Sequence, residues 1–134
     1  MIEIETLACG RATPMAGQGT LAISQGEATW ALRIPDDEPV FAGHYPNNPI
    51  FPGVYTLDLM CQCVEHWALA KGERLTLAVV RSIRYTRAIG PGDNVRIEIR
   101  IEDPVSEQEV AVRAVAWRGD DKAVSARLLM RHVR

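Results

Sequence analysis

Apolar and polar residues alternate in some parts of this chain and not in others. In residues 27–34 every second residue is apolar, and the Gln25-Gly26 pair just before them is typical of a hairpin turn. The apolar set is Ala28, Trp30, Leu32 and Ile34. Such alternation predicts a strand with one buried face. Residues 2–9 and 19–24 are shorter runs of the same kind, separated by glycine and proline, and we expect strands there too.

Residues 54–70 have a different pattern, with apolar side chains around almost the whole circumference of a helix. Pro52-Gly53 is a plausible helix entry, Lys71-Gly72 a plausible end, and no glycine or proline interrupts the segment. We therefore expect one helix that is enclosed by protein on most sides. The polar interruptions are Thr56, Asp58, Gln62, Glu65 and His66. Asp58, Gln62 and Glu65 are spaced i, i+4 and i+7, so they share one stripe of the helix.

Strand-like runs return after Gly72, at residues 75–89, 95–101, 109–117 and 123–132, with turns at 90–93 and 119–121. Proline-rich residues 35–52 favour a loop of fixed shape over a helix or a central strand. One long apolar helix among many strands predicts an α+β fold in which an antiparallel sheet wraps the helix. The 134 residues fit a single domain, 1–134, with a real core.

Composition narrows the function classes. The net charge of -2 gives no electrostatic reason to expect nucleic acid or an anionic membrane as partner. No apolar run reaches the roughly 20 residues that span a bilayer. The N-terminus lacks a basic region followed by an apolar one, so we expect no signal peptide and a cytoplasmic location.

The cysteines do not predict a metal site. Cys9, Cys61 and Cys63 are an odd number, and side chains two apart on a helix diverge by about 200°. We expect Cys61 and Cys63 to be small buried residues, with neither a disulfide nor a metal. No phosphate-binding loop, dinucleotide fingerprint or zinc spacing is present, so we expect no cofactor.

His44 and Asp58 are the candidate chemical groups. His44 lies in the proline-stiffened loop, and Asp58 lies on the apolar helix, where a carboxylate must be paired or hydrogen-bonded. An imidazole and a carboxyl group are the components of a general acid/base pair. A single histidine in a loop more often has a structural role than a catalytic one. The presence of Asp58 on the apolar helix makes proton transfer the favoured interpretation.

Gly53 and Gln62 are supporting candidates. Gly53, in the first helical turn, offers a backbone N–H that has no acceptor in the helix and can donate a hydrogen bond to an oxyanion. The alternative is that Gly53 only relieves crowding after Pro52. Both interpretations stay open. Gln62 is either part of the site or a satisfied buried amide. His66 and His132 fit no constellation and are expected to be structural.

These residues resemble the β-hydroxyacyl-acyl carrier protein dehydratases of fatty acid synthesis. Residues 43–54, GHYPNNPIFPGV, match that family's Gly-His-Phe-Pro signature with its later prolines and Pro-Gly, and a carboxylate follows the histidine by fourteen residues. Residues 57–62, LDLMCQ, and 83–93, IRYTRAIGPGD, continue the match. The resemblance spans about residues 41–101.

The resemblance implies a hot-dog fold and an active site shared across a homodimer, or a higher oligomer of dimers. His44 of one protomer would remove the C2 proton of a 3-hydroxyacyl thioester, and Asp58 of the other would protonate the leaving hydroxyl. The Gly53 N–H would hold the thioester oxygen, and Gln62 would support the carboxylate. The substrate would be a thioester of acyl carrier protein or coenzyme A, and the product a trans-2-enoyl thioester. Arg84 and Arg87 would steer an acidic carrier protein.

The chain departs from that family in two places. Short members carry Glu at the position of Asp58, whereas the longer dehydratase/isomerases carry Asp. The usual N-terminal His-Arg-Tyr-Pro-Phe motif is replaced by residues 9–14, CGRATP, which hints at a substrate of polyketide or other secondary lipid assembly. Two alternatives follow: a non-catalytic or co-catalytic subunit of a heterodimeric dehydratase, and a hot-dog acyl thioesterase.

Overall fold

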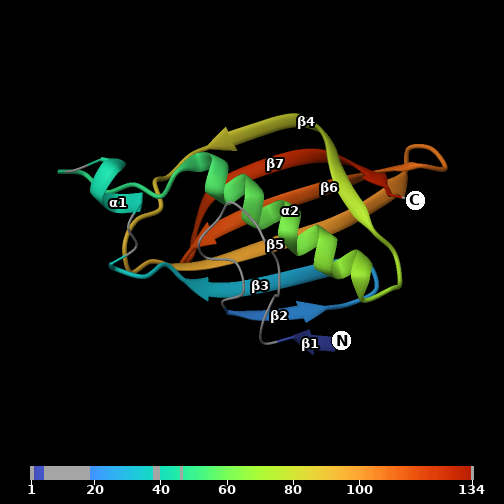
Figure 1. Ribbon diagram of the computed structural model, residues 1–134, viewed down its shortest axis with the longest axis horizontal. Helices are drawn as coiled ribbons and strands as arrows, with labels where there is room; N and C mark the ends of the chain where they lie inside the picture. Colours follow the sequence, from blue (N-terminus) through green and yellow to red (C-terminus); the bar gives the residue numbers. More distant parts are fainter. Residues whose placement is uncertain (1, 5–18, 38–39, 46, 134) are drawn as a thin grey trace.

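Residues 2–4, 19–37, 40–45 and 47–133 are described by a computed structural model. Within them, seven strands form one antiparallel sheet in the order β1-β2-β3-β5-β6-β7-β4, and helix α2 runs across one face (Figure 1). The elements are β1 (Ile2–Ile4), β2 (Thr20–Ile23), β3 (Glu27–Arg33), α1 (Val40–Gly43), α2 (Gly53–Leu69), β4 (Leu75–Tyr85), β5 (Asn94–Pro104), β6 (Glu109–Arg118) and β7 (Asp121–His132). The predicted α+β hot-dog architecture is confirmed.

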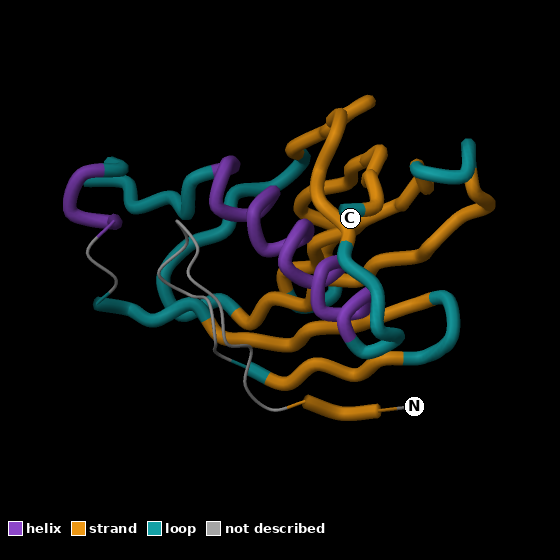
Figure 2. Tube along the Cα trace, turned by 45° about the vertical axis from the view of Figure 1, so that its right-hand side comes forward, coloured by secondary structure: helices purple, strands orange, loops and turns teal. Residues whose placement is uncertain are grey.

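The sheet curves around α2, as the tube in Figure 2 shows. Register shifts mark irregular pairing in β4, between Leu77 and Val79 and again between Val80 and Ser82, where it pairs with β7. Such irregularities bend a strand and increase its twist. The helix contacts β3, β4, β5 and β6, so the core lies between α2 and the concave face of the sheet.

Most of α2 is buried, as its apolar circumference predicts. Its buried residues are Thr56, Leu59, Met60, Cys61, Gln62, Cys63, Val64, Trp67 and Ala68. Two apolar residues differ from that expectation, because Val54 is 66% and Leu69 53% exposed. Val54 and Asp58 are spaced i, i+4, so an exposed apolar side chain lies beside the half-buried Asp58.

The C-terminal end of α2 confirms the predicted stop. Gly72 has a positive φ of 76°, which L-residues other than glycine rarely adopt. This conformation lets the Glu73 N–H donate to the Ala68 carbonyl at 2.9 Å. The Trp67 indole N–H donates to the Ser24 carbonyl at 3.0 Å, which ties the last turns of the helix to the β2–β3 hairpin.

The structure corrects two of the predicted elements. The segment 35–52 contains a one-turn helix, α1, because the Val40 carbonyl accepts the His44 N–H at 3.0 Å and Phe41 is buried. The strand predicted over 75–89 ends at Tyr85, because the following backbone leaves the sheet and the Ile89 carbonyl accepts the Phe51 N–H.

The N-terminal predictions are tested only in part. The strand predicted over residues 2–9 is present as β1 over Ile2–Ile4, and residues 5–9, including Cys9, lie outside the described residues. Residues 10–14 of the departing motif also lie outside them. Within the described ranges, no helix is both long and apolar enough to cross a bilayer.

Candidate active site

The loop that carries His44 is fastened at both ends by backbone hydrogen bonds. The His44 N–H donates to Val40 of α1, and the His44 carbonyl accepts the Ile50 N–H at 2.9 Å. Tyr45 and Asn48 exchange hydrogen bonds of 3.2 and 3.0 Å between their backbones, closing a tight turn between those two anchors. The proline-rich sequence therefore does form a loop of fixed shape around the histidine.

The His44 imidazole has a defined proton arrangement. Its Nδ1 lies 3.0 Å from the Ile50 carbonyl oxygen, which can only accept a hydrogen bond. Nδ1 must therefore carry the proton in the neutral ring, and Nε2 carries the lone pair. The Tyr45 ring stacks on the imidazole at 4.3 Å between centroids. The half-buried ring is thus oriented with a basic nitrogen pointing away from its anchor.

Asp58 is held by the residue one helical turn later. Gln62 Nε2 donates to Asp58 Oδ2 at 2.9 Å, and the Gln62 side chain is only 1% exposed. Packing fixes the amide, and the amide in turn orients the carboxylate, which is the pairing that an apolar helix demands. The predicted stripe therefore brings Asp58 and Gln62 together.

Gly53 is the first residue of α2, and the Tyr85 ring packs directly on it. A Cβ on Gly53 would lie 2.8 Å from the Tyr85 Cε1 and Cζ atoms, closer than real Cβ contacts come. Crowding is therefore one reason for glycine here, although the partner is Tyr85 rather than Pro52. As an N1 residue, Gly53 also has a backbone N–H with no acceptor inside the helix.

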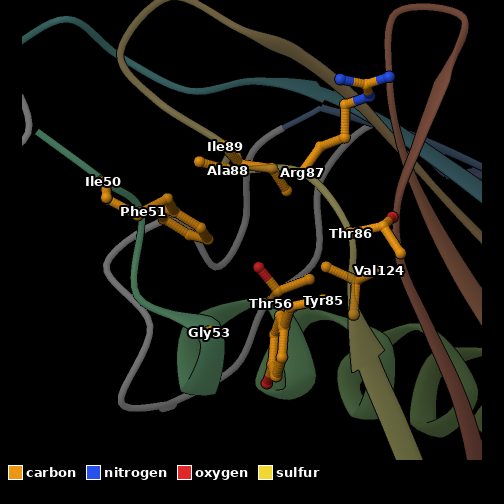
Figure 3. A pocket seen from close by; sticks show the side chains of 10 residues that line it. All are labelled: Ile50, Phe51, Gly53, Thr56, Tyr85, Thr86, Arg87, Ala88, Ile89 and Val124. Carbon is orange, nitrogen blue, oxygen red and sulfur yellow. The ribbon is translucent and has the colours of Figure 1, made fainter.

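A cavity of about 510 Å³ lies between the start of α2 and the segment after β4. Figure 3 shows its lining from close by. The wall includes Phe51, Gly53, Thr56, Tyr85, Ile89 and Val124. This size and its apolar lining are typical of a small-ligand site. Burial raises the pKa of Tyr85, so its hydroxyl stays protonated and can donate a hydrogen bond.

Asp58 and His44 are not part of that wall. Asp58 is two residues from Thr56 on α2, so the two side chains leave the helix about 200° apart. His44 directly follows α1, which stands out from the end of the sheet in Figure 1. Among the described residues, no hydrogen bond or ion pair joins His44 to Asp58. A single chain therefore presents the two groups separately.

The remaining candidates are placed as follows. Arg87 lines the cavity and lies 4.0 Å from Asp121, whereas Arg84 lies in a separate groove on the outer face of the sheet. Cys61 and Cys63 are buried, as predicted, and burial raises the pKa of the Cys63 thiol. In the described part of the chain, no three His, Cys, Asp or Glu side chains gather as a metal site would require.

Thr56 and Tyr85 are cavity residues to which the sequence pattern assigns no role. In the sequence, Thr56 is a polar residue in an otherwise apolar helix. This pattern identifies it as a candidate site residue only once the fold is known. Tyr85 meets Gly53 across a long sequence separation, and no local pattern predicts that contact.

Comparison with known families adds to this geometry. A family model for ApeI dehydratases, the ApeI-like family, matches residues 21–126. The chain belongs to the ApeI-like dehydratase family. The match includes the His44 loop, all of α2, strands β3 to β6 and the first half of β7.

Other relatives of this chain are FabZ proteins. The 3-hydroxyacyl-(acyl-carrier-protein) dehydratase FabZ of Symbiobacterium thermophilum is 36% identical over 114 residues, covering 81% of this chain and 79% of that protein. The FabZ of Latilactobacillus sakei is 29% identical over 131 residues, covering 94% and 93%.

Solved structures share the fold of this chain. The dehydratase heterocomplex ApeI:P from Xenorhabdus doucetiae aligns with a TM-score of 0.59 at 21% identity, over 81% of this chain and 89% of that one. The fluoroacetyl-CoA thioesterase FlK aligns with a TM-score of 0.65 at 19% identity, over 84% and 89%. Because one fold hosts both dehydratases and thioesterases, the reaction must be argued from the site.

The contact between Gly53 and Tyr85 predicts energetic coupling. Gly53→Ala must displace the Tyr85 ring, so Tyr85→Ala should cost less in that background than in the parent. Urea denaturation of the double-mutant cycle should give a coupling of at least about 0.5 kcal/mol. Gly26→Ala is the matched control, because nothing lies within 4 Å of its added Cβ and its effect should add to that of Tyr85→Ala. Additivity at Gly53 as well would contradict the contact.

Proposed function

We propose that this chain is a 3-hydroxyacyl-thioester dehydratase, which removes water to give a trans-2-enoyl thioester in fatty acid or polyketide-type biosynthesis. The observation that carries the proposal is the 3.0 Å contact between His44 Nδ1 and the Ile50 carbonyl, which leaves Nε2 as a base. Membership of the ApeI-like dehydratases and the identity to FabZ proteins support it.

The first step is removal of the C2 proton. The thioester carbonyl already acidifies C2, and His44 Nε2 takes the proton as general base. Negative charge then develops on the thioester oxygen. The Gly53 N–H at the positive end of the α2 dipole would donate a hydrogen bond to that oxygen.

The second step is loss of the C3 hydroxyl. Asp58, in its protonated form, gives a proton to the hydroxyl as the C3–O bond breaks, and the C2–C3 double bond forms. Gln62 holds the carboxyl group during this transfer. His44 ends with one proton more and Asp58 with one fewer, so exchange with solvent resets the pair. The thioester acidifies C2 and the two side chains supply both proton transfers, so the proposed reaction uses no cofactor.

Two protomers would share each site. β4 is the last strand of the sheet, pairs with β7 along one side, and carries Val79 at 46% exposure. A long edge strand with exposed apolar residues pairs readily with a strand of another chain unless something covers it. A second copy paired along β4 would cover it and bring Asp58 of one protomer toward His44 of the other.

A heterodimer is the alternative assembly, supported by the ApeI:P heterocomplex of Xenorhabdus doucetiae. In that case this chain would supply one half of the site, or only support a catalytic partner. Purified chain that is inert alone and active with a second subunit would favour this alternative.

Thioester hydrolysis is the alternative reaction, supported by the fold shared with FlK. Asp58 would then activate water against the thioester carbonyl. Hydrolysis releases a free thiol, whereas dehydration leaves the thioester intact, so thiol detection separates the two. The acyl carrier would be acyl carrier protein or coenzyme A, and Arg87 beside the cavity supplies a positive charge for either.

Removing either proton-transfer group should abolish most of the activity. His44→Ala and Asp58→Asn should each lower the hydration rate of a crotonyl thioester by at least about 100-fold, the scale of a lost general acid or base. His132→Ala, at the end of β7, is the control and should stay close to the parent. Activity within a few fold of the parent in either site variant would refute the assignment.

Blocking the β4 edge should separate the protomers. Val79→Lys places a charge on the exposed edge, so light scattering should show a monomer, and activity should fall because Asp58 of the partner is missing. Val105→Lys, at a 49% exposed position after β5, should leave both properties unchanged. A Val79→Lys protein that remains a fully active dimer would place the interface elsewhere.

A further inference from the structure

Thr56 is unusual among the residues that line the cavity. Its side chain is only 2% exposed, and no hydrogen bond of its hydroxyl is found among the described residues. Every fully sealed side-chain nitrogen or oxygen in that part of the chain has a partner. The Thr56 oxygen is therefore not sealed by protein but open to the cavity. Figure 3 shows it pointing into the space near Phe51 and Ala88.

Other polar groups of the wall already have partners or solvent. The Thr86 hydroxyl donates to the Lys122 carbonyl at 2.7 Å, and Arg87 lies near Asp121. Tyr85 is 51% exposed and has its hydroxyl near Gly53, so water reaches it. Thr56 is thus the buried polar group of the described wall that is left for a ligand.

An apolar ligand that filled the cavity would shut water out and leave the Thr56 hydroxyl without a hydrogen-bond partner, which is unfavourable. The neighbouring wall is apolar, with Phe51, Ile89 and Val124, so a valine would fill the Thr56 position without that cost. A ligand atom that forms a hydrogen bond with the hydroxyl would avoid that cost. The site would therefore favour ligands that carry such an atom over ligands that lack it.

The helix geometry says which part of a substrate reaches Thr56. Thr56 and Asp58 leave α2 about 200° apart, so the cavity lies on the other side of the helix from the proton donor. Gly53, the proposed oxyanion donor, is in the cavity wall one turn before Thr56. A chain bound with its thioester oxygen at Gly53 therefore reaches Thr56 with carbons beyond the reacting ones.

We infer that the Thr56 cavity selects acyl chains that carry a hydrogen-bonding oxygen beyond the reacting carbons, and that the Thr56 hydroxyl is the specificity-determining group. This inference rests on the proposed function for the position of the thioester. The ligand chemistry is a hydroxyl or carbonyl oxygen on an otherwise apolar chain. Thr56 holds this oxygen and takes no part in the proton transfers.

The test compares 3-hydroxyacyl thioesters of equal length on one carrier, with and without a second hydroxyl placed at successive carbons beyond C4. The parent should prefer one oxygenated chain by at least about 10-fold in kcat/KM. Thr56→Val should remove that preference by lowering kcat/KM on the oxygenated chain, and Thr56→Ser should retain the preference. A preference that survives in Thr56→Val, or a parent that favours the plain chain, would overturn the inference.

Calorimetric binding of the same thioesters to the Asp58→Asn protein separates this inference from the proposed reaction. The oxygenated chain should bind more tightly there, and Thr56→Val added to that background should make the two affinities equal. If the oxygenated chain binds more tightly but the parent dehydrates neither chain, the proposed reaction is wrong and this inference stands. If the parent dehydrates both chains but Thr56→Val changes neither the kinetic preference nor the relative affinity, this inference is wrong and the proposed reaction stands.

Discussion

The burial of α2 against the concave face of the sheet is the constraint on which the rest of this structure depends. Because most of the helix is buried, the buried polar groups on it need a partner or a ligand. Gln62 supplies that partner for Asp58, and packing of the amide fixes the carboxylate. Thr56, on another side of the same helix, meets a cavity instead. The positions of both follow from one buried element.

The second constraint is the loop between α1 and α2. Its backbone hydrogen bonds hold His44 Nδ1 against the Ile50 carbonyl, so the basic nitrogen is oriented before substrate arrives. Groups that are held in place in advance do not have to be ordered during the reaction, which is where much catalytic power originates. The same loop connects to the cavity through the hydrogen bond from Phe51 to the Ile89 carbonyl.

Local patterns predict the local parts of this structure well. The apolar run after Pro52 gives α2 to within a residue at each end, and the spacing of Asp58 and Gln62 predicts their contact. Long-range pairings escape such patterns. β4 ends early because Ile89 bonds to Phe51, and Gly53 is crowded by Tyr85; both contacts join segments far apart in the sequence. The shared site is harder still, because it depends on a second chain.

The proposed reaction requires that His44 and Asp58 act from different protomers. Co-expression of a His44→Ala chain with an Asp58→Asn chain tests it directly, because each variant alone should be inactive. Random pairing of such chains makes about half of the dimers mixed, and each mixed dimer keeps one intact site, so about one quarter of the parent activity should return. No recovery, from mixed dimers verified by two different affinity tags, would contradict the claim.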